Sequence, residues 1–151
     1  MANAPTFNVN LQEISLEGYQ IVSSKYFGRQ TSATMSLQKK CIVFNSEVVK
    51  QLNSCEAITI MINEKNRTLL VKPISSHDSE AILWNKGGEK QYARLECITL
   101  TKYLMELWEL SDKIKYILSG RLVRAENKVG MIFELDHCEM YNSETGKRIW
   151  E

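Results

Sequence analysis

Two pairs of alternating apolar segments, placed on either side of one short helical pattern, constrain the fold more than any other feature of this sequence. In the first pair, the alternating run Ala33–Leu37 and the β-branched and aromatic run Cys41–Phe44 flank a short polar break. Residues 58–73 repeat the arrangement around a polar turn at residues 64–67. Alternation with a period of two predicts a half-buried strand, and two such runs around a polar break predict a hairpin. The region therefore predicts two β-hairpins.

A short helix is predicted between these two hairpins. Val48, Val49 and Leu52 recur at the spacing of a small amphipathic helix. Asn45 or Ser46 stands directly before them, and a side-chain oxygen at this position accepts a hydrogen bond from a free N–H group of the first helical turn. The chain from residue 33 to residue 73 is thus predicted to run strand, strand, helix, strand, strand.

A second helix and a third hairpin are predicted in the carboxy-terminal half. Thr99 is the expected N-cap of this helix. The third hairpin is predicted from apolar runs within residues 116–123 and 129–135, joined by a polar turn. These patterns predict a β-rich α+β fold, dominated by hairpins and with two helices. The apolar residues of the second helix follow the i, i+3, i+4, i+7, i+8 stripe of a surface helix, and they are Leu100, Tyr103, Leu104, Leu107 and Trp108.

Length and patterning divide the chain into three parts. A chain of 151 residues has the size of one compact domain or of two small ones. Residues 31–141 are expected to form a single α+β domain, and residues 142–151 a polar C-terminal tail. Residues 1–30 are expected to form an N-terminal arm with one or two short strands and a turn near Gly18. The alternating residues of this arm are Phe7, Val9 and Leu11.

The titratable residues form no catalytic or metal-binding pattern, so no catalytic residue, metal ion or cofactor is predicted. His77 lies in a polar stretch, and His137 directly precedes Cys138. Adjacent residues of a strand point to opposite faces, which separates this imidazole from this thiol. The four cysteines include no CxxC pair and lack the spacing of a zinc site. Gly87-Gly88 lacks the context of a phosphate-binding loop and predicts a turn.

Composition indicates an ordinary globular chain, with 44% apolar and 25% charged residues. No segment approaches 18 consecutive apolar residues, and residues 1–10 lack the basic and apolar runs of a signal peptide. We therefore expect a cytoplasmic protein with reduced thiols and no membrane partner.

Charge is balanced over the whole chain and uneven along it. The 19 basic and 18 acidic residues give a formal charge of +1, so nucleic-acid binding would depend on a local surface. Residues 25–72 carry a local charge of +5, whereas residues 78–112 carry −3. Cations at hairpin turns either reach phosphate groups or are simply solvated. The predicted nucleic-acid-binding residues are Lys39, Lys40, Lys50, Lys65 and Arg67.

A second basic group borders the third predicted hairpin. Tyr116 lies among these cations, and an aromatic ring in such a setting can stack on an unpaired base. The other interpretation of Tyr116 is a side chain on the core face of a sheet. The basic group consists of Lys113, Lys115, Arg121, Arg124 and Lys128.

The order of elements over residues 33–73 resembles the swapped-hairpin unit of the AbrB/MazE-like regulators. The resemblance implies an intertwined homodimer that binds DNA through basic hairpin residues. In that dimer, Ile58, Ile60 and Ile62 are expected to lie in a shared core. The family usually has Gly-Arg before its second strand and an Arg in its helix. This chain has Lys40-Cys41 in the first place and Lys50 as the nearest helix cation, so Lys39, Lys40 and Lys50 would supply the charge instead.

A longer stretch, residues 26–141, resembles a group of uncharacterised bacterial proteins found beside recombinases in Firmicute mobile elements. This resemblance implies a bacterial, intracellular setting and no particular activity. It is carried by Ile42–Asn45, by Ala57–Asn63 followed by Leu70–Pro73, by Ile82–Trp84 and by Lys115–Gly120.

Three hypotheses for function follow. The first is a non-enzymatic DNA-binding or regulatory accessory protein, a homodimer that contacts the phosphate backbone through basic hairpin tips. The alternative is a protein-interaction or assembly module that uses a sheet edge or the Trp108 face of its helix and has no nucleic-acid role. The third is an enzyme whose site brings His77 or His137 next to Cys41, Cys97 or a carboxylate.

Overall fold

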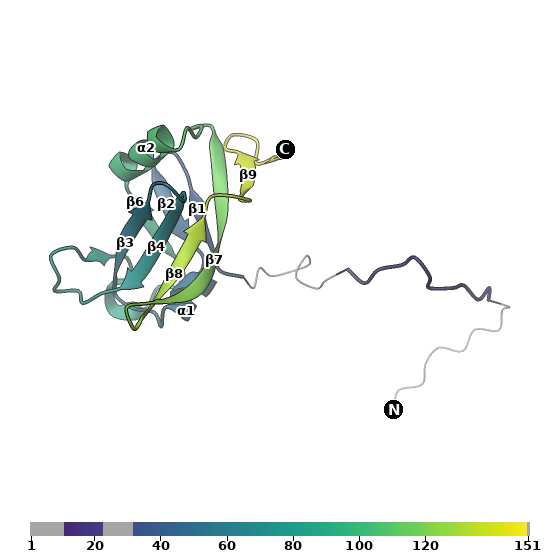
Figure 1. The fold of residues 1–151 in the computed structure, drawn as a ribbon, viewed down its shortest axis with the longest axis horizontal. Helices are drawn as coiled ribbons and strands as arrows, with labels where there is room; N and C mark the ends of the chain where they lie inside the picture. The colour runs from purple at the N-terminus through teal and green to yellow at the C-terminus, as the bar shows by residue number, and fades with distance from the viewer. Residues whose placement is uncertain (1–10, 23–31, 151) are drawn as a thin grey trace, which may run out of the picture. The chain divides into compact units, whose positions relative to one another are not determined.

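The computed structural model describes residues 11–22 and 32–150, which fall in two separate units of the chain (Figure 1). Residues 11–22 contain a turn at Glu17–Gly18 and no strand. The turn predicted near Gly18 is therefore present, whereas the predicted strands are not found in residues 11–22. Phe7 and Val9, on which the strand prediction also rested, lie outside the described residues.

Residues 32–150 form an antiparallel sheet that curls around a core, with two α-helices (Figure 1). The strand order is β5-β3-β4-β8-β7-β1-β2-β6, and β9 pairs with both β7 and β10. The prediction of a β-rich α+β domain with two helices is confirmed. The strands are β1 (Thr34–Leu37), β2 (Cys41–Phe44), β3 (Ala57–Asn63), β4 (Thr68–Pro73), β5 (Ile82–Leu83), β6 (Ala93–Glu96), β7 (Ile114–Ala125), β8 (Lys128–Glu134), β9 (Glu139–Asn142) and β10 (Arg148–Ile149).

The three predicted hairpins are β1–β2, β3–β4 and β7–β8, and each forms an antiparallel pair. Three short strands were not predicted, namely β6, β9 and β10. β6 pairs with β2, and β9 pairs with the first residues of β7. The polar residues expected as a C-terminal tail return to the sheet, because Arg148–Ile149 pairs with β9.

Helix α1 (Ser46–Gln51) forms where the sequence predicts it, and Asn45 is its N-cap. The Asn45 Oδ1 atom accepts hydrogen bonds from the Val48 N–H at 3.2 Å and from the Thr34 N–H at 3.1 Å. The Asn45 Nδ2 group donates to the Ser32 carbonyl at 2.9 Å. One side chain therefore holds both the start of the helix and the start of β1. Val48 and Val49 are buried against the core.

Helix α2 (Ile98–Leu107) begins earlier than predicted, since its N-cap is Cys97 rather than Thr99. The Cys97 N–H donates to the Lys40 carbonyl at 3.0 Å, so pairing with the β1–β2 turn fixes where the helix starts. Trp108, the C-cap residue, is only 7% exposed and belongs to the core. Trp108 itself is therefore not available to a partner, whereas Tyr103 of the same predicted stripe is 42% exposed.

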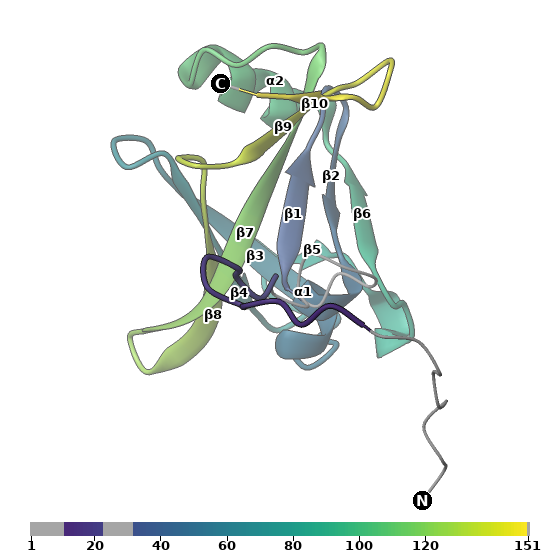
Figure 2. The same ribbon diagram turned by 90° about the vertical axis from the view of Figure 1, so that its right-hand side faces the viewer.

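The core fills the inside of the curled sheet. The Phe44 ring lies 5.2 Å from the Trp84 ring and 5.8 Å from the Phe133 ring, measured between centroids. Ile58 is fully buried in this core, and Ile60 and Ile62 pack against it in part. The isoleucines that the AbrB resemblance places in a dimer core thus pack within the core of a single chain. Helices α2 and α1 lie at opposite ends of the sheet (Figure 2).

Candidate nucleic-acid interface

The β1–β2 and β3–β4 turns meet at α2, which hydrogen-bonds to both of them. The Thr101 hydroxyl donates to the Lys39 carbonyl at 2.6 Å. The Tyr103 hydroxyl donates to the Glu64 carboxylate at 2.8 Å, and the Trp108 Nε1–H donates to the Glu64 carbonyl at 3.2 Å. The helix therefore brings four predicted nucleic-acid-binding residues to one end of the domain, and they are Lys39, Lys40, Lys65 and Arg67.

Acidic side chains offset much of the positive charge at this α2 end. The Lys39 Nζ atom lies 3.7 Å from the Asp112 carboxylate, and the Arg67 Nη1 atom lies 3.6 Å from the Asp136 carboxylate. Both are ion pairs between exposed or half-exposed side chains, which stabilise a fold by about 0–1 kcal/mol. The cation-rich segment 25–72 therefore does not produce a strongly basic surface at this end.

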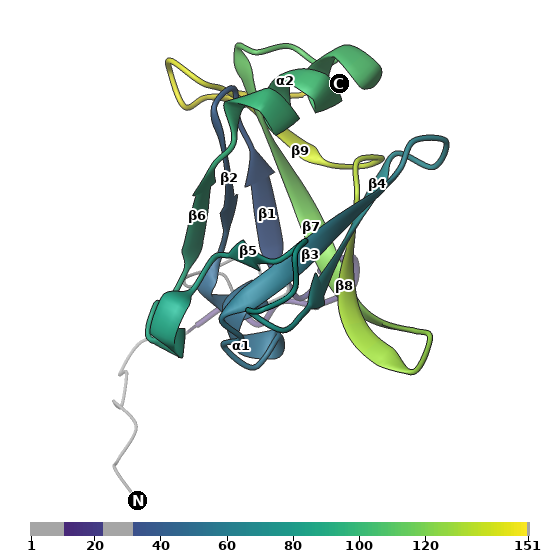
Figure 3. The same cartoon turned by 90° about the vertical axis from the view of Figure 1, so that its left-hand side faces the viewer.

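Lys50, the fifth predicted residue, lies on α1 at the other end of the domain (Figure 3). The structure therefore groups four of the five predicted residues and separates Lys50 from them. The predicted hairpin already implied this separation, because a segment that follows the second strand of a hairpin starts at the end opposite the turn.

The β7–β8 hairpin extends beyond its neighbouring strands as a two-stranded ribbon, which we define as residues 121–130. Strand β1 pairs with β7 only as far as Ser119, and β4 pairs with β8 only from Met131 onward. Residues 121–125 and 128–130 therefore pair only with each other among the described strands. Figures 2 and 3 show this ribbon projecting from the sheet at the α1 end.

A tight two-residue turn closes the ribbon. Ala125 pairs with Lys128, and the intervening Glu126 and Asn127 have φ values of 51° and 66°. Two consecutive positive φ values define a type I′ turn, whose twist matches that of paired strands. The ribbon is consequently narrow at its tip.

Cations lie on both faces of the ribbon. Lys128 lies on one face and Arg124 on the other, as the alternation of strand residues requires. Both are exposed, and neither forms an ion pair within residues 32–150. Arg121 at the base is bonded to Glu134 at 2.8 Å, and Glu126 is the ribbon's one acidic residue. The sequence singled out these cations as a basic group but not as a site, because their projection depends on where β1 and β4 stop.

Tyr116 is not a stacking platform in this structure. Its side chain is 5% exposed, and its hydroxyl oxygen accepts a hydrogen bond from the Ser111 N–H at 2.9 Å. The core interpretation of Tyr116 is therefore confirmed. Lys113 and Lys115 lie near the first residues of β7, away from the ribbon at its other end.

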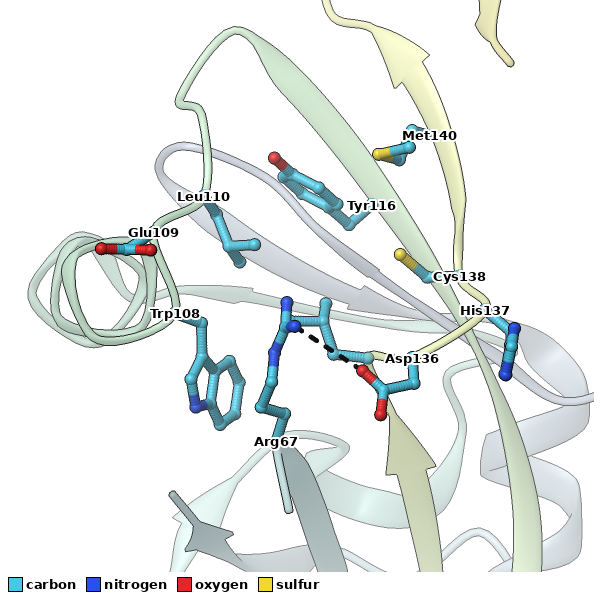
Figure 4. A pocket seen from close by; sticks show the side chains of 10 residues that line it. Arg67, Trp108, Glu109, Leu110, Tyr116, Asp136, His137, Cys138 and Met140 are labelled. Carbon is cyan, nitrogen blue, oxygen red and sulfur yellow. Dashed lines mark ion pairs between the residues drawn. The ribbon is translucent and has the colours of Figure 1, made fainter. Parts of the chain in front are cut away.

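A cavity of about 540 Å³ lies between the end of α2, the β3–β4 turn and the connection from β8 to β9 (Figure 4). Arg67 reaches into it from the β3–β4 turn. Three of its lining residues have left-handed backbones, with φ values of 55° at Arg67, 53° at Glu109 and 66° at His137. Each of them ends a helix or lies in a turn, where a left-handed residue is common.

His137 and Cys138 lie in the connection between β8 and β9 rather than on a strand, and Figure 4 shows the imidazole and the thiol pointing in different directions. Burial raises the pKa of the thiols of Cys41, Cys55 and Cys97 above the ordinary value of 9.0, which disfavours the reactive thiolate. Within residues 11–22 and 32–150, no group of three or more His, Cys, Asp or Glu side chains is placed to hold a metal ion.

Comparison with protein-family models gives no match, and comparisons with curated proteins and with solved structures find no similar protein. Among the described helices, none is long and apolar enough to cross a membrane. The functional argument therefore rests on the geometry of this chain.

Proposed function

We propose that this protein is a non-enzymatic DNA-binding or regulatory accessory protein that contacts the phosphate backbone chiefly through the β7–β8 ribbon. One observation carries the proposal: the ribbon projects beyond its flanking strands and presents Arg124 and Lys128, which have no acidic partner among the described residues. Exposed cations without an internal partner are the groups that exchange counterions for phosphates.

The shape of the ribbon supports this role. Paired strands lie about 4.8 Å apart, and a two-stranded ribbon enters the major groove of B-DNA, which is about 12 Å wide. Lys72 adds a cation at the base of the ribbon, next to Gly130. The Lys72 side chain occupies space that a larger residue at position 130 would need, because a Cβ atom there would lie 3.0 Å from the Lys72 Cγ atom.

The originally predicted residues take a smaller part in this proposal. Lys39 and Arg67 each face a carboxylate, so a phosphate would have to displace Asp112 or Asp136. Lys40 and Lys65 lie at the same end without a carboxylate partner among the described residues. We expect this end to bind DNA more weakly than the ribbon does.

The test compares two double variants that remove the same charge from opposite ends. Binding to a mixed-sequence DNA duplex is measured across a salt series for the wild type, for R124A/K128A and for K39A/K40A. Each lost phosphate contact lowers the slope of log affinity against log salt by about 0.9. We expect the slope to fall by about 1.8 in R124A/K128A, and to fall less in K39A/K40A.

The control variant also decides where the site lies. A larger loss in K39A/K40A would move the interface to the α2 end, as the sequence first indicated. Absence of binding by the wild type at low salt would reject the DNA-binding proposal. Circular dichroism of each variant establishes that the fold is intact.

A protein-interaction module is the second candidate, and the apolar residues of the ribbon favour it. Leu122 and Val129 share one face of the ribbon and are 48% and 49% exposed. The open edges on either side have unpaired backbone groups, which a partner strand can bind by β-addition. A nuclease-insensitive, stoichiometric complex that is lost in V129K would favour this candidate over DNA binding.

A further inference from the structure

We propose that the cavity beside α2 binds a small organic carboxylate with an apolar body, and that Arg67 anchors the carboxylate. This site lies at the opposite end of the domain from the β7–β8 ribbon. The inference is therefore independent of the proposed DNA-binding function.

Arg67 is a half-exposed guanidinium whose hydrogen-bonding groups are not satisfied by the protein. Its contact with Asp136, at 3.6 Å, is longer than a hydrogen bond, and its buried Nε–H has no partner. No N–H group of this side chain donates a hydrogen bond within the described residues. A guanidinium presents parallel N–H groups that match the two oxygens of a carboxylate. The exposed part of the Arg67 guanidinium can therefore donate to an acceptor of this kind in the cavity.

The remaining walls of the cavity favour an apolar body on the ligand. Leu110 and Met140 line the space that the Arg67 guanidinium faces, and Tyr116 and Trp108 add ring surfaces (Figure 4). A volume of about 540 Å³ is in the range of sites for small molecules. The combination of one cation and apolar walls fits a short fatty acid or an aromatic acid.

The charges around the cavity select a singly charged ligand. Arg67 is the only lining residue with a permanent positive charge, and Glu109 and Asp136 are the lining carboxylates. A phosphate dianion would meet more repulsion here than a monocarboxylate. Asp136 competes with the ligand for Arg67, so neutralising Asp136 should strengthen binding.

The cavity forms where three loops meet, and each contributes one residue with a left-handed φ angle, namely Arg67, Glu109 and His137. Ordinary turn geometry accounts for these angles. Glu109 directly follows the C-cap of α2, and His137 lies in a turn that is closed by the Cys138 N–H, which donates to the Leu135 carbonyl at 3.1 Å. The indication of a ligand therefore rests on Arg67 and on the walls of the cavity.

The test uses hexanoate and benzoate as probes and inorganic phosphate for comparison. The readout is the NMR signal of the Trp108 indole N–H, because Trp108 lines the cavity. We expect a saturable shift with each carboxylate and a weaker response to phosphate. The R67M variant should bind the carboxylates at least about tenfold more weakly, as expected for loss of a charge-assisted hydrogen bond. The D136N variant should bind them more tightly.

K65M is the matched control, because it removes a cation two residues away that does not line the cavity. Its carboxylate affinity should equal that of the wild type. If R67M does not fold, R67K keeps the charge and loses the paired geometry, and weaker binding is again expected. The proposal is overturned if no carboxylate shifts the Trp108 signal, if Arg67 variants bind like the wild type, or if phosphate binds more tightly than both carboxylates.

Discussion

Replacing Asn45 with alanine is expected to lower the free energy of unfolding by about 2–4 kcal/mol. Asn45 serves two elements, since its Oδ1 atom accepts from the N–H groups of both Val48 and Thr34. Loss of a helix N-cap costs about 1 kcal/mol. Thr34 is 8% exposed, and a buried N–H left without a partner costs about 1–3 kcal/mol.

The N45D variant is the matched control. An aspartate keeps the oxygen that accepts from Val48 and Thr34, and it replaces the Nδ2 donor, 2.9 Å from the exposed Ser32 carbonyl, with an oxygen that cannot donate. Its negative charge at the start of α1 is favourable to the helix dipole. We therefore expect N45D to lose less than about 1 kcal/mol.

Urea unfolding followed by tryptophan fluorescence measures both variants, because Trp84 is buried in the core. Comparable slopes against urea are needed for the free energies to be compared. A loss below about 1 kcal/mol in N45A, or equal losses in N45A and N45D, would refute the argument that this one side chain holds both β1 and α1.

Three further predictions follow from the β7–β8 region and the buried thiols. A Cβ at Gly120 would lie 2.6 Å from the Phe133 ring, so G120A should lower stability by about 1–3 kcal/mol in urea unfolding; an unchanged midpoint would contradict this contact. Glu126 has a φ of 51°, and E126N should raise the unfolding midpoint because asparagine tolerates this conformation better; a lowered midpoint would contradict the turn assignment. Burial raises the folded-state pKa of the Cys55 thiol above 9.0. The stability that this thiol contributes is therefore fully present below its unfolded pKa and is lost as the pH rises through its folded pKa. The free energy of unfolding, measured from about pH 8 to pH 10, should decline less steeply in C55A than in the wild type.

The sequence alone determined the locally encoded parts of this fold. The three hairpins were predictable because the side chains of each strand alternate and polar residues mark each turn. Helix α1 was predictable because its cap and its apolar residues lie within eight positions of one another, from Asn45 to Leu52. In each case the residues that interact are close neighbours in the chain.

Short edge strands and the start of α2 depended on distant residues instead. β10 has two residues, too few to show a period, and pairing with β9 defines it. The four residues of β6 lie at the edge of the sheet, where pairing with β2 defines the strand. Helix α2 starts after Cys97 because the Cys97 N–H donates a hydrogen bond to the carbonyl of Lys40, which lies more than fifty positions earlier in the chain. Thr99 had the better capping side chain, but this tertiary hydrogen bond set the boundary.

The tertiary structure also decided which cations share a surface. The sequence placed Lys39, Lys50 and Arg67 in one basic segment, yet the sheet sends Lys50 to the α1 end and sets Asp112 and Asp136 against the other two. The β7–β8 ribbon exists because β1 and β4 stop before β7 and β8 do. The cavity at Arg67 joins three loops that are far apart in the chain. Periodicity encodes how a segment pairs with its neighbour, whereas surface charge and cavities arise only when distant segments meet.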